Sequence, residues 1–377
     1  MRLKHTKKIN IFTGGIMGKT RASETPITSD RENNLNIIRF LSALMVIYGH
    51  MFSLVHANSQ PVFLGQSIAT IGVCIFFILS GYLVGLSYER DSNVLRYVIR
   101  RSFRIIPGLI MLVLITVFII GPIFTTGSIT EYFSSPLIGE YLRNMAFRIS
   151  YILPNVFTAN PYPQAVNGSL WSLPVEVLMY AFLPLLLFAL KKFKYKDIVL
   201  AGVTILLIVL NYYPALGNIT IYHVNILQAL SIAPYFLIGY LFSVPQIKKI
   251  LNLQVALFIF ILFAFIQVPA EIGVLLAYIV IPYTVFSLGF ATKPVFMKFG
   301  VKNDYSYGLF LYGFLSQQML IDIFSIRMGA AVPFFIYLAL SIGLSFAFAL
   351  LSWHCVEKPM QQLSRRLLTK LSRRDSR

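Results

Sequence analysis

The sequence predicts an all-α integral membrane protein of about ten transmembrane helices, and three observations lead to this fold class. Of the 377 residues, 57% are hydrophobic and only 12% are charged, which is about half the charged share of a soluble domain. The apolar residues gather in runs of nearly the length that a bilayer core of ~30 Å requires. The basic residues gather in alternate connections between these runs, which indicates a fixed orientation in the membrane.

Ten apolar runs are separated by polar connections. Several are short for a membrane span, for which about 20 residues are typical. Proline inside some runs is compatible with a membrane helix, because neighbouring groups re-satisfy the backbone. The runs cover residues 35–55, 66–88, 105–120, 174–190, 198–212, 224–242, 251–268, 272–290, 306–323 and 333–353.

Charge predicts the orientation of these spans. With a cytoplasmic N-terminus, 28 of the 32 Lys and Arg residues fall on the cytoplasmic side, three fall outside and Arg39 lies within the membrane. We therefore expect both termini to be cytoplasmic, in a bacterial inner membrane with the lipid bilayer as a partner. Basic loops beside anionic lipid also account for the net charge of +18, so no nucleic-acid partner is expected.

The chain divides into a membrane domain and two tails. Residues 1–33 predict a disordered basic cytoplasmic tail, with Met17 as an alternative start, and residues 363–377 predict a second basic cytoplasmic tail. Residues 34–362 hold the ten-helix domain. Within it, residues 121–170 form one long outer segment of about fifty residues, a length that is usually functional. Residues 138–149 of this segment have the periodicity of an amphipathic helix on the outer surface.

Arg39 and His50 lie eleven positions apart in the first run. Eleven residues turn a helix by ~1100°, so both side chains share one face and are separated by roughly 16 Å along the axis. An arginine in the membrane costs ~2.5–3.5 kcal/mol on insertion scales, and such residues are usually functional. The alternatives are an Arg39 that extends to the inner interface and a His50 that is hydrogen-bonded between helices. If functional, a neutral His50 can accept a proton from an incoming hydroxyl.

Arg101 and Arg104 lie three positions apart before the third run, so they project from one side of a helical turn. Two guanidinium groups at the cytoplasmic mouth of a span can bind phosphates in a bidentate manner. The alternative is a simple basic anchor beside the membrane.

Glu176 is the one carboxylate clearly inside a run, and it ends the segment WSLPVE at 171–176. Intramembrane acids need a partner. Glu176 and His50 both fall on the outer half in the expected topology, so a histidine–carboxylate pair is possible. Ser172 would complete a nucleophilic triad with them, or would simply cap the helix.

Two further segments predict local structure. FFILSGYL at 76–83 indicates close helix packing through Ser80 and Gly81. HCVEKP at 354–359 indicates the end of a helix with a salt bridge. The two cysteines lie in or beside apolar runs and the five histidines lack the spacing of a zinc site, so we expect neither a disulfide nor a metal.

Taken together, these segments resemble the membrane-bound acyltransferase 3 family, which O-acylates cell-surface glycans and related hydroxyl acceptors. One departure is Gly313 after Tyr312, where many members have a histidine, so the role of that histidine is absent or moved here. The matching segments follow the family order over residues 33–362: Arg39-x10-His50, FFILSGYL at 76–83, RSFR at 101–104, WSLPVE at 171–176, SYGLFLYG at 306–313 and VEKP at 356–359.

The resemblance implies a donor site on the cytoplasmic side. An acyl-CoA, with acetyl-CoA as the default, would supply the acyl group. Arg101 and Arg104 would hold its phosphates, and Ser80 and Tyr82 would lie at the same site.

The resemblance also implies a catalytic and acceptor site. Arg39 and His50 would be an essential pair, in which His50 acts as a general base or passes the acyl group across the membrane. Glu176 would orient His50, and Trp171 and Ser172 would contact a carbohydrate acceptor.

The expected function is therefore acyl transfer, most simply acetyl transfer, from cytoplasmic acyl-CoA to a hydroxyl of a surface or lipid-linked carbohydrate at the outer face. The first alternative is a transporter or flippase for a polar glycan, with Arg39 and His50 in its pathway. The second is a non-catalytic subunit of a polysaccharide export machine. No internal repeat supports an inverted-repeat transporter. Loss of thioester from acyl-CoA that depends on His50 separates the enzyme from both.

Overall fold

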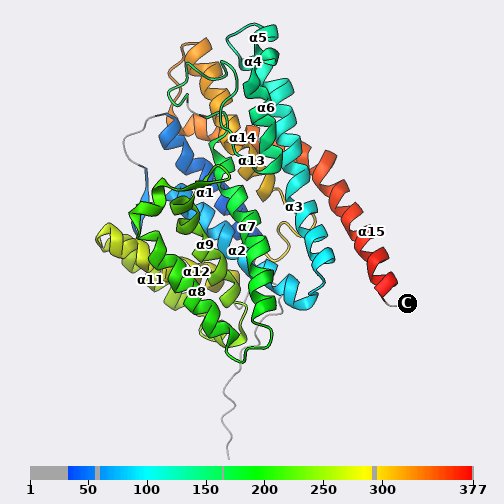
Figure 1. Cartoon of the computed structure of the whole chain (residues 1–377). Coiled ribbons are helices and arrows are strands. Elements are labelled where there is room, and N and C mark those ends of the chain that lie inside the picture. Colours follow the sequence, from blue (N-terminus) through cyan, green and yellow to red (C-terminus); the bar gives the residue numbers. More distant parts are fainter. Residues whose placement is uncertain (1–32, 56–59, 164, 291–294, 376–377) are drawn as a thin grey trace, which may run out of the picture.

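The computed structural model describes residues 33–55, 60–163, 165–290 and 295–375, so the expected disordered tail lies outside the described residues except for Asn33. The described residues are mostly helical (Figure 1). The long helices are α1 (Leu35–Leu54), α2 (Ile68–Arg90), α3 (Val94–Ile115), α7 (Ser172–Ala189), α8 (Lys196–Asn211), α9 (Ile226–Leu241), α11 (Leu253–Phe265), α12 (Ala270–Gly289), α13 (Ser306–Ile321), α14 (Phe334–Ser352) and α15 (Lys358–Asp375). The short elements are α4 (Gly121–Phe124), α5 (Ile129–Ser134), α6 (Pro136–Leu142), α10 (Pro245–Lys248) and two antiparallel pairs of two-residue strands, β1 (Val62–Phe63) with β2 (Gln66–Ser67) and β3 (Thr220–Ile221) with β4 (Val224–Asn225).

This helical architecture confirms the all-α membrane class. Each of the ten expected spans contains a helix. The count of ten crossings and the side of each terminus stay predictions, because α8 and the shorter helices are brief for a span. In the described part of the chain, seven helical segments are long and apolar enough to cross a membrane, namely Leu35–Leu54, Ile68–Arg90, Val94–Phe124, Gly168–Ala189, Ala270–Gly289, Ser306–Arg327 and Phe334–Arg373, and Ile226–Leu241 and Leu253–Phe265 are shorter apolar helices.

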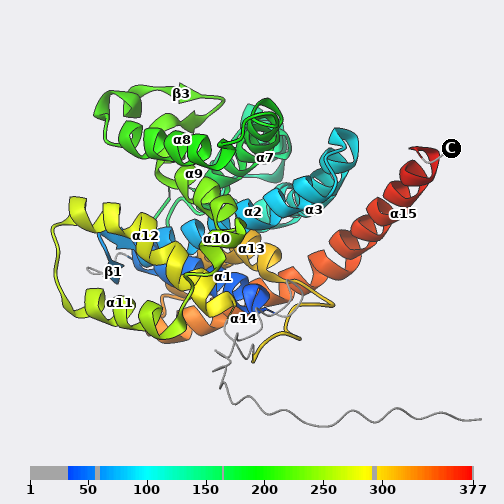
Figure 2. The ribbon, with the colours of Figure 1, turned by 90° about the horizontal axis from the view of Figure 1, so that it is seen from below.

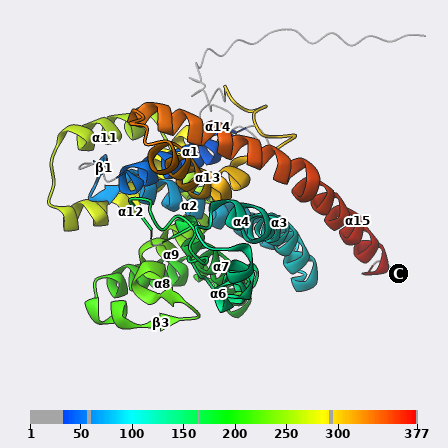
Figure 3. The same cartoon turned by 90° about the horizontal axis from the view of Figure 1, so that it is seen from above.

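Helix α13 forms the centre of the bundle, and all sixteen of its residues are buried. Seen from above, it lies among α1, α2, α3 and α14 (Figure 3). Its buried amides bind backbone carbonyls of neighbouring segments. Gln317 Nε2 donates to Ile47 O of α1 at 2.7 Å, and Gln318 Nε2 donates to Tyr162 O and Ala165 O at 2.7 Å each. The Gln318 amide therefore fixes the long outer segment to the C-terminal end of α13.

Helices α2 and α9 cross with almost no space between their backbones. Gly81 lies against the carbonyl of Phe236, and Gly239 lies against the carbonyl of Ile78, so closely that a Cβ at either glycine would overlap the facing carbonyl. Small residues permit this approach in membrane bundles, where close backbone packing is a main source of association. The packing role expected of Gly81 is confirmed, and it fixes the rotation of α2 that presents Ser80 to α7.

The helix expected in the outer segment has different bounds in the structure. The expected helix over 138–149 is wrong in its bounds, because α6 ends at Leu142 and one 3₁₀ turn follows at Arg143–Ala146. Asn144 explains the early end. Its side chain accepts from Ser150 N at 2.9 Å and donates to Ser150 O at 2.8 Å, and such bonds compete with the helical ladder.

The segment HCVEKP does not end a helix, so that expectation is also wrong. A π-helical turn, Trp353–Glu357, joins α14 directly to α15. Glu357 accepts a hydrogen bond from Ser352 Oγ at 2.7 Å instead of pairing with Lys358, whose Nζ donates to Asn303 Oδ1 at 3.3 Å. The proline is tolerated here because the π-helical turn already interrupts the regular backbone ladder.

The expected C-terminal tail of residues 363–377 is mostly helix. Residues 363–375 belong to α15, whose far end projects away from the bundle (Figure 2). The first turns of α15 pack beside α3. This continuation matters for the site, because it brings basic side chains of α15 close to Arg39 of α1 and Arg104 of α3.

Candidate active site

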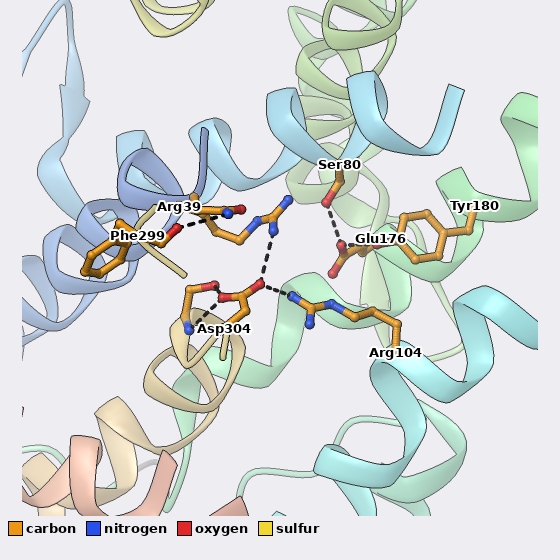
Figure 4. Close-up of polar contacts among 9 residues, drawn as sticks. Arg39, Ser80, Arg104, Glu176, Tyr180, Phe299 and Asp304 are labelled. Carbon is orange, nitrogen blue, oxygen red and sulfur yellow. Dashed lines mark hydrogen bonds and ion pairs between the residues drawn. The ribbon is translucent and has the colours of Figure 1, made fainter. Parts of the chain in front are cut away.

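Asp304, in the connection before α13, lies between two arginines from different helices. Its Oδ2 accepts hydrogen bonds from Arg39 Nη1 of α1 at 3.2 Å and from Arg104 Nη2 of α3 at 2.6 Å (Figure 4). Burial raises the pKa of the Asp304 carboxyl, but Arg104 and Arg39 outweigh burial and hold the pKa well below its ordinary range. Asp304 is therefore ionised at neutral pH and offsets part of the positive charge of both arginines.

Glu176, in the second turn of α7, forms a second polar cluster. Its Oε1 accepts hydrogen bonds from Ser80 Oγ of α2 at 2.9 Å and from Tyr180 OH at 2.6 Å (Figure 4). The Arg101 guanidinium carbon lies 5.8 Å from the centre of the Tyr180 ring, within cation–π range. The intramembrane carboxylate thus has partners, as its cost requires, and they are hydroxyl groups.

The two clusters line one cavity inside the bundle, with a volume of ≈ 70 Å³. Residues of α1, α2, α3, α7 and α13 contribute to its wall. Six of the nine candidate residues from the sequence meet here, namely Arg39, Ser80, Arg101, Arg104, Ser172 and Glu176. Side chains that lie more than 130 positions apart are therefore brought to one place by the packing of the helices.

The arginines of the RRSFR segment are used differently. Arg100 Nη1 pairs with Asp91 Oδ2 at 2.7 Å, at the start of α3 and outside the cavity. Arg104 is paired with Asp304. Arg101 has no carboxylate partner among the described residues, and its Nε is buried without a hydrogen bond there. Arg101 is therefore the cation of this segment that is available to an anionic ligand.

His50 lies farther along α1, outside the lining of this cavity. Its ring packs edge-on against Phe314 of α13, with 5.2 Å between the ring centres. In the described part of the chain its Nδ1 is buried without a hydrogen-bond partner, and no hydrogen bond joins it to Glu176. The expected histidine–carboxylate pair is not formed. The sequence indicates how deep His50 and Glu176 lie in the membrane. A contact between them also requires that α1 and α7 be rotated so that the two side chains face each other.

The remaining candidates lie around the cavity. Ser172 is buried and lines it, one turn before Glu176, whereas Trp171 is half-buried and outside the lining. Tyr82 is two residues beyond Ser80 and so projects from the other side of α2. There it packs against Phe286, with 5.1 Å between ring centres.

Sequence reasoning misses Asp304, although it joins the two arginines. An aspartate two residues before an apolar run has the signature of a helix cap, and Asp304 Oδ1 does accept from Ser306 N at 3.1 Å. Only the other oxygen, Oδ2, binds the arginines. Tyr180 is also missed, since a tyrosine in an apolar run is indistinguishable from a packing residue.

Comparisons with known proteins identify the family of the chain. The family model described as an acyltransferase domain, of the acyltransferase 3 type, matches residues 32–350, which include every residue of the cavity lining. An O-acetyl transferase of Shigella phage Sf6 is 27% identical over 338 residues, which are 87% of this chain and 96% of the phage protein. Nodulation protein 10 of Rhizobium leguminosarum bv. viciae is 30% identical over 174 residues, which are 42% of this chain and 45% of that protein. No solved structure matches the chain.

The family match therefore covers most of the chain, and it includes the apolar helices and the arginine-lined cavity between them. A relative named as an O-acetyl transferase aligns over nearly its whole length. The chain belongs to the acyltransferase 3 family and is a membrane O-acyltransferase.

Proposed function

We propose that this enzyme transfers an acyl group, by default acetyl, from cytoplasmic acyl-CoA to a hydroxyl of a surface or lipid-linked carbohydrate at the outer face of a bacterial inner membrane. The observation that carries the proposal is Arg101, which has no carboxylate partner among the described residues and lies beside the Arg39–Asp304–Arg104 cluster in an apolar bundle. A guanidinium group without a carboxylate partner in such surroundings favours a phosphate-bearing ligand.

The donor would enter from the end of the bundle that carries most of the basic connections. Arg101 and Arg104 would bind its phosphates, and the arm that carries the thioester would pass the Ser80–Glu176 pair. Arg39 and His50 are separated by roughly 16 Å along α1. The flexible pantetheine arm spans this interval, so that the acyl group reaches the level of His50 while the phosphates stay with the arginines.

The chemistry requires a proton acceptor at the far end of this path. The acceptor hydroxyl oxygen forms a bond to the thioester carbonyl carbon, and the carbon–sulfur bond breaks. The hydroxyl proton passes to neutral His50, and the departing thiolate takes up a proton to become the free thiol. The buried His50 Nδ1 has no hydrogen-bond partner in the described residues, so a substrate hydroxyl that reaches it would find its hydrogen-bonding capacity unused. A two-step route, in which the acyl group first bonds to His50, uses the same residue.

The outer segment and the relatives support the second part of the proposal, which is the transfer of an acetyl group to a polar acceptor. Asn160 Nδ2 donates to Gln318 Oε1 at 2.9 Å, which holds this segment over the outer end of α13. A long ordered segment beside the path is a suitable place to bind a polar acceptor. The name of the phage relative supports acetyl as the transferred group. No contact in the described structure favours the transporter or subunit alternatives.

Inverted membrane vesicles that contain the enzyme and endogenous lipid-linked glycans test the proposal. With radiolabelled acetyl-CoA, we expect release of free thiol and label in the extracted glycolipid. His50→Gln should lower both by about 10²–10⁴-fold, because Gln keeps a hydrogen bond but not the basicity. His354→Gln is the matched control, since His354 contacts Tyr305 outside the cavity.

Two results would contradict this mechanism. Near-normal turnover of His50→Gln would make His50 structural. An absence of thiol release from acetyl-CoA with the unaltered enzyme would remove the donor assignment. If His50→Ala blocks labelling of the glycolipid but preserves hydrolysis of acetyl-CoA, His50 acts on the acceptor rather than on the donor.

A further inference from the structure

A second, wider polar cavity adjoins the first and shares Arg39 and Arg104 with it. We call it the vestibule. It lies between the connection before α13 and the first turns of α15, and its volume is ≈ 280 Å³, against ≈ 70 Å³ for the inner cavity. The vestibule therefore offers the larger space to the bulky part of a ligand, whereas the inner cavity suits a narrow arm.

The vestibule carries a large excess of positive charge. Its lining contains five cationic side chains and one carboxylate. That carboxylate, Asp304, already binds Arg39 and Arg104. Among the described residues, the other three cations of the lining have no carboxylate partner. They are Lys302, Lys358 and Arg365.

An orphaned amide independently indicates a ligand at this place. Gln361 lines the vestibule, and its Nε2 is buried without a hydrogen-bond partner in the described structure. An unsatisfied buried donor is destabilising unless a bound group accepts its hydrogen bond. Lys358 has one neutral acceptor, Asn303, so its charge is likewise open to an anion.

The basic wall of the vestibule depends on the π-helical turn. The α15 residues of the lining are Lys358, Gln361, Gln362 and Arg365, which follow the i, i+3, i+4, i+7 pattern of one helix face. The π-helical turn Trp353–Glu357 sets the rotation of α15, and with it the direction of this face. The wall lies beyond residue 350, where the family match ends.

We propose that the vestibule binds a phosphomonoester dianion, the 3′-phosphate of the acyl-CoA donor, through Lys302, Lys358 and Arg365. The inference rests on the proposed function, since it assumes acyl-CoA as donor. The shared Arg39 and Arg104 let one extended molecule occupy both cavities. Its nucleotide end lies in the vestibule, and its thioester arm lies in the inner cavity beside Glu176. A phosphate from an anionic lipid headgroup has the same chemistry, and the experiment separates the two sources.

The test compares acetyl-CoA with 3′-dephospho-acetyl-CoA on the full chain in phosphatidylcholine nanodiscs, with thiol release as the readout. We expect the KM of the unaltered enzyme to be at least tenfold lower for acetyl-CoA than for 3′-dephospho-acetyl-CoA. The triple variant Lys302→Ala, Lys358→Ala and Arg365→Ala should raise the KM for acetyl-CoA at least tenfold and leave that for the dephospho donor unchanged.

A matched control removes three cations from the same connection and helix but outside the vestibule lining. It combines Lys298→Ala, Arg366→Ala and Lys370→Ala, and it should keep the preference for acetyl-CoA. The single variant Arg365→Glu guards against a folding defect of the triple variant. Its negative charge should raise the KM for acetyl-CoA and spare the dephospho donor.

Each other result of this experiment contradicts either the 3′-phosphate inference or the proposed function. The vestibule does not bind the 3′-phosphate if the triple variant still prefers acetyl-CoA over the dephospho donor, or if the unaltered enzyme has no such preference. The proposed function stands in both cases as long as acetyl-CoA is consumed. If the triple variant loses activity equally with both donors, and only in nanodiscs that contain phosphatidylglycerol, the vestibule binds a lipid phosphate and the inference is wrong. If the unaltered enzyme consumes neither donor, the proposed function itself fails.

Discussion

Arg104 and Asp304 are 200 positions apart in the chain, yet Arg104 Nη2 donates to Asp304 Oδ2 at 2.6 Å. Arg39 shares the same oxygen at 3.2 Å. One carboxylate therefore connects the first, third and ninth expected spans, at the mouth of the proposed donor path. This cluster keeps a net positive charge, because two guanidinium groups share one carboxylate.

Replacing Asp304 by Asn should destabilise the protein strongly. The change keeps the shape of the side chain but leaves Arg39 and Arg104 facing each other without a counter-charge. Removing one partner of a buried ion pair costs about 3 kcal/mol or more, so we expect a clear drop in the thermal unfolding temperature in detergent. Asp91→Asn is the control, since Asp91 binds Arg96 and Arg100 outside the cavity and should cost less. Equal unfolding temperatures for Asp304→Asn and the unaltered protein would show that the cluster does not hold the helices together.

Arg101→Ala should weaken donor binding without destabilising the fold. Arg101 has no carboxylate partner in the described structure, so its removal leaves no buried charge behind. Hydrogen bonds to charged groups contribute about 1.5–3 kcal/mol, which corresponds to roughly a 10- to 100-fold rise in the KM for acetyl-CoA. Arg101→Lys should recover part of this loss, because an ammonium group cannot reproduce the two-pronged geometry. In the control Arg100→Ala, the KM for acetyl-CoA should be unchanged. An equal rise in KM for this control would show that the arginines of residues 100–104 only anchor the chain at the membrane.

Gly81→Ala should disrupt the crossing of α2 and α9. The added methyl group overlaps the carbonyl of Phe236, and backbone cannot move aside as a side chain can. Overpacking of this kind costs about 1–3 kcal/mol or more, and Ser80 would be displaced from Glu176, so both stability and turnover should fall. Gly343→Ala in α14 meets nothing within 4 Å and should be neutral or slightly stabilising. Thermal unfolding and thiol release measure the two effects, and a stable, active Gly81→Ala enzyme would contradict the close crossing.

The topology can be tested by cysteine labelling of intact cells. In a background without Cys74 and Cys355, a membrane-impermeant maleimide should label a cysteine at position 150 and should not label one at position 370. This follows from the excess of basic residues on the side that we expect to be cytoplasmic. Labelling at 370 from outside, or labelling at 150 only after the membrane is opened, would reverse the orientation and with it the side of the donor.

The sequence by itself determined the membrane class, the helices of the bundle and most of the polar residues of the cavity. These follow from local properties of the chain: apolar runs give spans, and charged or polar side chains inside them are costly enough to indicate function. The tertiary structure alone decided which of these residues meet. The bond from Ser80 to Glu176 crosses 96 positions, and that from Arg39 to Asp304 crosses 265. It also separated His50 from Glu176, because the rotation of each helix is set by packing such as that of Gly81, which leaves no periodic signal in the sequence.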